Sequence, residues 1–85
     1  MANERFEYKT AKPIYQYGIV GAEKDMGETD NLDEAIKCVE EEADGVEDRS
    51  PWAREMYIVV SNDGGEWFEV LRVYDLPSRS WNREE

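Results

Sequence analysis

Histidine is absent from this 85-residue chain, and cysteine occurs only once. Without histidine, a protein lacks the usual general base near neutral pH and the commonest ligand for metals. These shortages exclude Ser-His-Asp and Cys-His catalytic sites, histidine-based zinc sites and four-thiolate metal sites. The single thiol, Cys38, cannot form an internal disulfide, and its acidic neighbours make it a poor nucleophile. The sequence therefore contains no catalytic signature, and we expect the chain not to be an enzyme.

Long apolar runs and clustered basic residues are missing as well. No stretch approaches the roughly 20 apolar residues that cross a bilayer, and the first residues contain no apolar segment of signal-peptide length. With a single cysteine besides, we expect a cytoplasmic protein without membrane contact. Ten basic residues against 21 acidic ones give a net charge of −11. That charge disfavours direct binding to nucleic acid or anionic lipid and favours basic partners.

The acidic residues are concentrated in one segment. Twelve of the 21 lie in residues 23–48, where only Lys24 and Lys37 oppose them, so this segment carries −10 of the net −11. The remaining 59 residues hold nine acids and eight bases and are nearly neutral. The charge can therefore form one strongly negative surface. A uniformly acidic, halophile-type exterior without a partner is disfavoured.

One amphipathic helix is predicted after residue 31. Asn31 is a favourable N-cap, and Glu34 three residues later completes a capping box. Gly45 is well placed to end the helix in a left-handed conformation. At about 100° per residue, one apolar stripe forms from Leu32, Ala35, Ile36, Val39 and Ala43. Charged residues cover the opposite side of the helix.

Alternating apolar and polar residues predict four strands, at residues 6–9, 14–20, 55–61 and 66–75. The sequence Asn-Asp-Gly-Gly at residues 62–65 predicts a hairpin turn between the last two. Gly18 predicts a bulge or a close approach of another backbone. Residues 21–30 are predicted as a loop or a ragged strand extension, and residues 78–85 as a polar tail.

These elements predict a single small domain over residues 1–85, with residues 1–4 and 78–85 flexible. The order β-β-α-β-β with one apolar helix stripe is typical of the α+β class. We expect a four-stranded, largely antiparallel sheet with the amphipathic helix on one face. The other face would be partly exposed and would hold the aromatic residues that exceed the needs of the core.

A divalent cation site is an alternative use of the acidic residues before the helix, because calcium prefers several carboxylate oxygens. The four candidates are Glu23, Asp25, Glu28 and Asp30. Gly27 is not at the position that an EF-hand loop requires. We therefore expect a solvated acidic loop, with no metal and no cofactor.

The candidate partner-binding residues lie on the polar side of the predicted helix, in the connector just past its predicted end at Gly45, and in the tail. Seven carboxylates form what we call the acidic ridge: Asp33, Glu34, Glu40, Glu41, Asp44, Glu47 and Asp48. Because a helix rises about 1.5 Å per residue, a folded ridge of this kind roughly imitates a stretch of phosphate backbone. Trp81 is the remaining candidate, either as an exposed aromatic anchor or folded back onto the open sheet face.

The sequence thus favours a small acidic protein-binding domain, an inhibitor that blocks a basic partner such as a nuclease or a DNA-binding protein. In size, acidity and single-helix layout the chain resembles small phage-encoded inhibitors of the anti-defence type, which block host nucleic-acid-binding proteins. The resemblance covers no alignable segment and assigns no residue. The alternative is a structural or assembly module, a homodimer through the open sheet face or the strand at residues 6–9, whose acidity serves solubility only.

Overall fold

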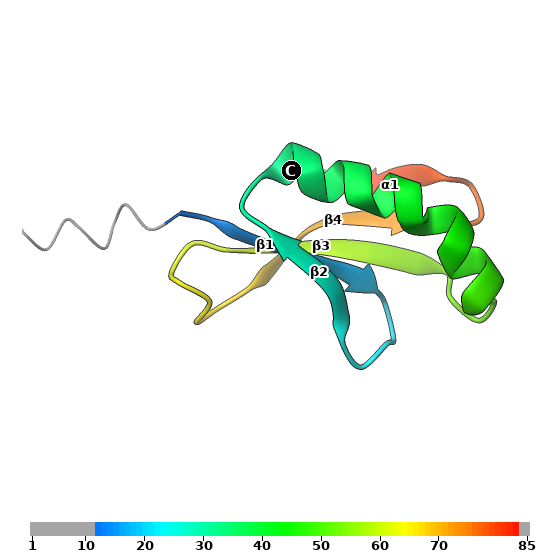
Figure 1. The fold of residues 1–85 in the computed structure, drawn as a ribbon, viewed down its shortest axis with the longest axis horizontal. Helices are drawn as coiled ribbons and strands as arrows, with labels where there is room; N and C mark the ends of the chain where they lie inside the picture. Colours follow the sequence, from blue (N-terminus) through cyan, green and yellow to red (C-terminus); the bar gives the residue numbers. More distant parts are fainter. Residues whose placement is uncertain (1–11, 84–85) are drawn as a thin grey trace, which may run out of the picture.

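The computed structural model describes residues 12–83. Its elements are β1 (Ile14–Ile19), β2 (Asp25–Thr29), α1 (Leu32–Arg49), β3 (Glu55–Ser61), β4 (Glu69–Asp75) and β5 (Ser80–Arg83). The strands form one antiparallel sheet in the order β2-β1-β3-β4-β5, and α1 lies across one face of it (Figure 1). The predicted α+β class and element order are confirmed, with five strands in the sheet instead of four.

The two strands that local sequence did not indicate are the edge strands. β2 lies in the segment predicted as a loop or ragged extension, where Gly27 makes room for the ring of Tyr17 from β1. β5 lies in the segment predicted as a polar tail, and Trp81 packs it against Tyr74 of β4. Both therefore depend on contacts with their neighbouring strands, which override a weak local preference. The strand predicted at residues 6–9 and the predicted flexibility of residues 1–4 lie outside the described residues.

The helix begins where it was predicted to begin and ends later. Asn31 is the N-cap, and its side chain accepts a hydrogen bond of 3.0 Å from the backbone N–H of Glu34. The reciprocal bond of the predicted capping box is replaced, because the N–H of Asn31 donates to Thr29 Oγ1 instead. Gly45 does not end the helix, which continues to Arg49. The added turn buries Val46 completely, and this burial outweighs the low helix propensity of glycine.

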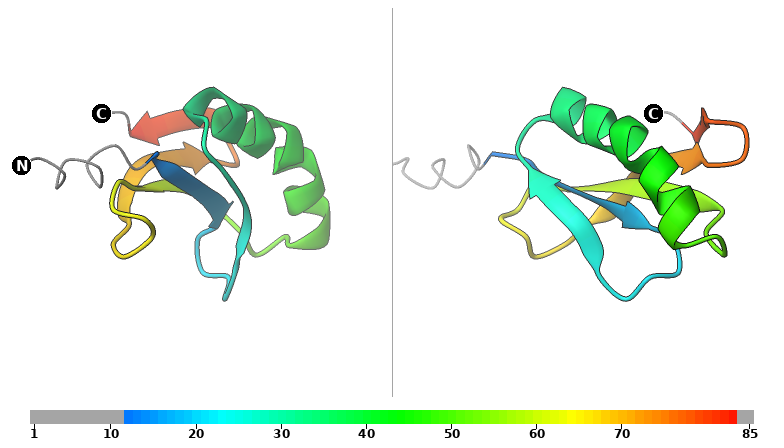
Figure 2. Two further views of the ribbon diagram at one scale, coloured as in Figure 1. Left: turned by 60° about the vertical axis from the view of Figure 1, so that its left-hand side comes forward. Right: turned by 45° about the vertical axis from the view of Figure 1, so that its right-hand side comes forward.

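The core fills the space between α1 and the sheet. The predicted stripe supplies Ala35, Val39 and Ala43, all buried, while the strands supply Met56 and Ile58. The sheet curls, so that the β4–β5 hairpin rises beside the helix (Figure 2). The polar side of α1 consequently faces solvent, with one flank next to this hairpin.

Candidate functional site

The acidic ridge is an exposed surface along α1 that Lys37 interrupts between Glu34 and Glu40. Because the opposite side of the helix packs on the sheet, all seven of its carboxylates are exposed. They extend from Asp33 to Asp48, which corresponds to about 22 Å along the helix axis. A single DNA strand places about six or seven phosphates over that length, at about 3.4 Å each. Lys37 is the one basic residue on this side and lowers the negative charge midway along the ridge.

Three carboxylates on one flank of the ridge are bound by the β4–β5 hairpin. Arg79 Nη2 donates to Asp44 Oδ1 at 2.6 Å and to Glu47 Oε1 at 2.9 Å. Trp81 Nε1 donates to Glu40 Oε2 at 2.9 Å. These bonds connect residues 32 to 41 positions apart and fix one flank of the ridge to the sheet.

Asp44 is the most crowded carboxylate of the ridge, which explains why Arg79 lies against it. On a helix, residues three and four positions apart are neighbours, and like charges there repel each other. Asp44 has an acidic residue at each of its four such positions: Glu40, Glu41, Glu47 and Asp48. The carboxylates of Glu47 and Asp44 in turn raise the pKa of the Arg79 guanidinium above its ordinary value. Arg79 Nη1 also donates to the carbonyl of Leu76, a bond within the turn between β4 and β5.

The outer row of the ridge consists of Glu34, Glu41 and Asp48. These three residues are seven positions apart, or about two helical turns, so they lie in line about 10 Å from one another. Within residues 12–83 none of them makes a side-chain hydrogen bond or ion pair, and all three are exposed. The outer row is therefore the part of the ridge that is available to a partner.

Trp81 is not the freely exposed anchor that was one of the two predictions for it. Its ring is half-buried, with the centroid 4.7 Å from that of Tyr74 and the planes inclined by 58°. It folds onto the helix-covered side of the sheet, where it packs against the core, and not onto the open face. Trp81 thus contributes to the ridge by holding Glu40. No local pattern in the sequence indicated this contact or that of Arg79, because both depend on how the sheet curls.

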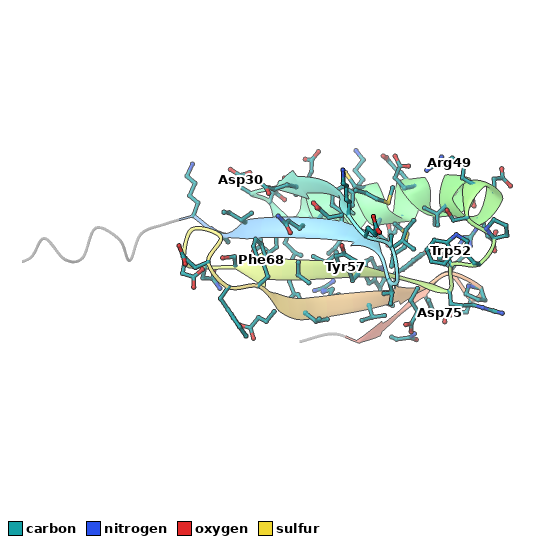
Figure 3. All side chains as sticks on the ribbon, turned by 90° about the horizontal axis from the view of Figure 1, so that it is seen from below. Asp30, Arg49, Trp52, Tyr57, Phe68 and Asp75 are labelled. Atoms are coloured by element: carbon teal, nitrogen blue, oxygen red, sulfur yellow. The ribbon has the colours of Figure 1, made fainter. Side chains whose placement is uncertain are left out.

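The acidic segment before the helix does not assemble into a cation site. Glu28 accepts a hydrogen bond of 3.0 Å from Gln16 on β1, and Asp25 lies near Tyr57, whose pKa is raised by burial and by this negative charge. Among the described residues, no group of three or more His, Cys, Asp or Glu side chains is close enough to hold a metal ion. Asp30 and Arg49 lie near the two ends of α1, well separated along the molecule (Figure 3).

Comparisons with known proteins add no family or relative to these observations. Neither a protein-family model, nor a curated protein, nor a solved structure matches the chain. In the part of the chain that the structure describes, no helix has the length and apolar character needed to cross a bilayer. The site is therefore defined by its own residues: a held flank at Glu40, Asp44 and Glu47, and an outer row at Glu34, Glu41 and Asp48.

Proposed function

We propose that this chain is an inhibitor or adaptor that acts by binding, with the acidic ridge occupying the basic groove of a nucleic-acid-binding protein such as a nuclease. The observation that carries the proposal is the linear arrangement of seven exposed carboxylates on a single helix. Their average spacing along the axis, about 3.7 Å, is close to the roughly 3.4 Å between the phosphates of one DNA strand, with a longer interval of about 9 Å between Glu34 and Glu40. A groove that accepts a nucleic-acid backbone therefore meets a similar row of negative charges.

The rigid attachment of the ridge supports this function. A flexible acidic tail would lose conformational entropy on binding, whereas a surface that is already ordered binds at a lower cost. Here the helix is capped by Asn31, packed through Val39 and Val46, and tied to the turn of the β4–β5 hairpin through Arg79. The carboxylates are consequently held at fixed separations before any partner arrives.

Electrostatics also determines how such a complex would form. An acidic ridge and a basic groove attract each other over several ångströms, which speeds association and makes it sensitive to salt. The contacts that can be removed without disturbing the fold are those of the outer row. Glu40 is unsuitable for this test, because its carboxylate accepts the bond from Trp81 and its loss would affect the attachment of β5.

The test compares two variants with the same change in charge. In the ridge variant, Glu34→Gln, Glu41→Gln and Asp48→Asn remove the outer row. In the control variant, Glu23→Gln, Glu66→Gln and Glu69→Gln remove three exposed carboxylates that lie outside α1. Each tagged protein is used to capture binders from a lysate of the source cell at about 50 mM and about 200 mM salt, and these are identified by mass spectrometry.

We expect the original chain and the control variant to capture the same basic nucleic-acid-binding protein at the lower salt concentration. Capture should be reduced at the higher concentration and abolished by added duplex DNA. The ridge variant should lose the capture. Equal capture by the ridge and control variants, or a partner that duplex DNA does not displace, would contradict the proposal.

A further inference from the structure

Trp67, in the loop between β3 and β4, has the most exposed large apolar side chain among residues 12–83, with an exposed fraction of 69%. Trp81 is half-buried against the core, and the ring of Trp52 lies near Gly21, where an added Cβ would be 3.4 Å from it. In the same part of the chain, Trp67 belongs neither to the core cluster nor to the side chains packed against it. Its indole is therefore free for a partner, and its removal should leave the fold intact.

The β3–β4 loop holds the backbone of Trp67 in a fixed position. Ser61, which is buried, accepts a hydrogen bond of 3.0 Å at Oγ from the N–H of Gly65. Asp63 Oδ1 accepts hydrogen bonds of 3.1 and 3.0 Å from the N–H groups of Glu66 and Trp67. These bonds order the loop as far as the residue that carries the indole. An aromatic side chain has only two χ angles to fix, so an indole on an ordered backbone loses little conformational entropy on binding.

The charged residues next to Trp67 in the chain are all acidic. Residues 55–71 contain four acids and no base. Glu66 and Glu69 flank Trp67, are exposed, and make no side-chain hydrogen bond or ion pair with any residue that the structure describes. Lys12, which precedes β1 at this end of the sheet, offsets only part of this charge. Because the face of an indole ring is also electron-rich, both the ring and the carboxylates attract a cation.

We propose that Trp67, Glu66 and Glu69 form a binding site for an arginine side chain of another protein, which we call the hairpin site. The guanidinium stacks on the indole face and pairs with the flanking carboxylates. Arginine fits this site better than lysine, because its guanidinium is planar, more weakly hydrated and able to stack on an aromatic ring. The inference goes beyond the proposed function, since the hairpin site lies outside α1 and uses no carboxylate of the acidic ridge.

Trp52 provides a comparison that isolates the role of charge. Its side chain is 56% exposed, in the connector between α1 and β3. The charged residues on either side of it in that connector are Arg49 and Arg54, both exposed, so a cation is repelled there. Figure 3 shows Trp52 near one end of the molecule and Phe68, the neighbour of Trp67, towards the other. The two exposed indoles therefore report on separate surfaces of opposite charge.

The test is an NMR titration of the isotope-labelled full chain with the peptide acetyl-Gly-Arg-Gly-amide at about 50 mM salt. The control peptide carries citrulline in place of arginine, which keeps the shape of the side chain and removes its charge. We expect the arginine peptide to shift the indole N–H signal of Trp67 with a Kd in the millimolar range, as suits a single exposed cation–π contact. The citrulline peptide should not shift it, and the indole signal of Trp52 should respond to neither peptide.

Two double variants with the same change in charge locate the site. Glu66→Gln with Glu69→Gln should weaken binding at Trp67 at least about threefold, because each removes an exposed ion pair with the guanidinium. Glu34→Gln with Glu41→Gln removes two carboxylates of the outer row and should leave that binding unchanged. Equal weakening by the two variants would overturn the proposal, as would the absence of any shift at Trp67 up to about 50 mM peptide.

The two peptides and the two indoles give further outcomes that would overturn the proposal. These are equal shifts with the arginine and citrulline peptides, or a signal of Trp52 that shifts as much as that of Trp67. Failure of the hairpin site is distinguishable from failure of the ridge, because the control variant of the lysate experiment also lacks Glu66 and Glu69. That variant should keep its capture and bind the arginine peptide weakly, whereas the ridge variant should lose its capture and bind the peptide normally.

Discussion

Side-chain hydrogen bonds stabilise the turns of two hairpins in this small domain. In the β3–β4 hairpin, Asp63 Oδ1 accepts hydrogen bonds from Ser61 Oγ and from the N–H groups of Glu66 and Trp67. The bond from Ser61 is the main reason why the pKa of Asp63 is lowered. In the β4–β5 hairpin, Arg79 adopts a φ of 55°, a conformation that is uncommon for residues other than glycine. Its three side-chain hydrogen bonds to Leu76, Asp44 and Glu47 stabilise that conformation.

Tyr17 provides a test at the same scale. A hydrogen bond to the Cys38 thiol and burial are the main causes that raise the pKa of Tyr17 to about 12. A tyrosine in an unfolded chain has a pKa of about 10. Because the folded state favours the neutral phenol, its contribution to stability is complete below about pH 10 and is lost as the pH rises towards 12. We expect the tyrosinate absorbance of the original chain minus that of Tyr17→Phe to titrate near pH 12. A difference titration near pH 10 would contradict this environment.

At the scale of secondary structure, Gly45 in α1 and Gly18 in β1 differ in whether the surrounding structure has room for a side chain. Gly45 lies inside α1 with helical geometry, and an added Cβ would contact only the far end of the flexible Arg49 side chain. Gly18 lies at the irregularity in the β1–β2 pairing, where an added Cβ would be 2.6 Å from Tyr57 Oη and 3.0 Å from Asp25 Cα. The first position tolerates a methyl group, and the second does not.

This difference predicts opposite effects of the same substitution. Gly45→Ala should raise the free energy of unfolding by about 0.5–1 kcal/mol, because alanine loses less backbone entropy in a helix. Gly18→Ala should lower it by about 1–3 kcal/mol, because the tyrosine ring and the β2 backbone must move. Urea unfolding of both variants beside the original chain measures the two values. A destabilising Gly45→Ala would mean that α1 does not extend through residue 45.

How far each element was predictable from the sequence depends on whether its signal is local. The helix start at Asn31, the buried stripe and the β3–β4 hairpin are specified by neighbouring residues, and all were predicted. The prediction that Gly45 ends the helix was wrong, because the burial of Val46 is a tertiary effect. β2 and β5 were not predicted as strands, because pairing with β1 and β4 determines them. The ridge carboxylates from Asp33 to Asp44 were placed on the helix for the same local reason as the helix itself. The position of Glu47 and Asp48 on α1 was not predicted, because it depends on the added turn. The contacts of Arg79 and Trp81 were not predicted either.

At the scale of the whole molecule, the acidic ridge and the uncovered face of the sheet lie on opposite sides. The carboxylates of the ridge lie on the outer side of α1, while Val59 pairs with Val70, and Tyr57 with Val73, on the face of the sheet opposite α1.

The concentration of charge also predicts how stability responds to salt. Each pair of like charges three or four residues apart on a helix costs a few tenths of a kcal/mol at low ionic strength, and Asp44 belongs to four such pairs. The Debye length falls from about 30 Å at 0.01 M salt to about 3 Å at 1 M, so added salt screens this repulsion. We expect the Tm of the original chain to rise over that range.

Arg79→Gln should lower the Tm strongly at about 0.01 M and much less at about 1 M, because salt then replaces the screening that Arg79 supplies. The matched control is Arg54→Gln, which changes the net charge equally but removes an exposed arginine that makes no ion pair within residues 12–83. Thermal unfolding followed by circular dichroism gives all three salt profiles. Parallel profiles for the two arginine variants would show that the total charge, and not the position of Arg79 beside Asp44, determines the response.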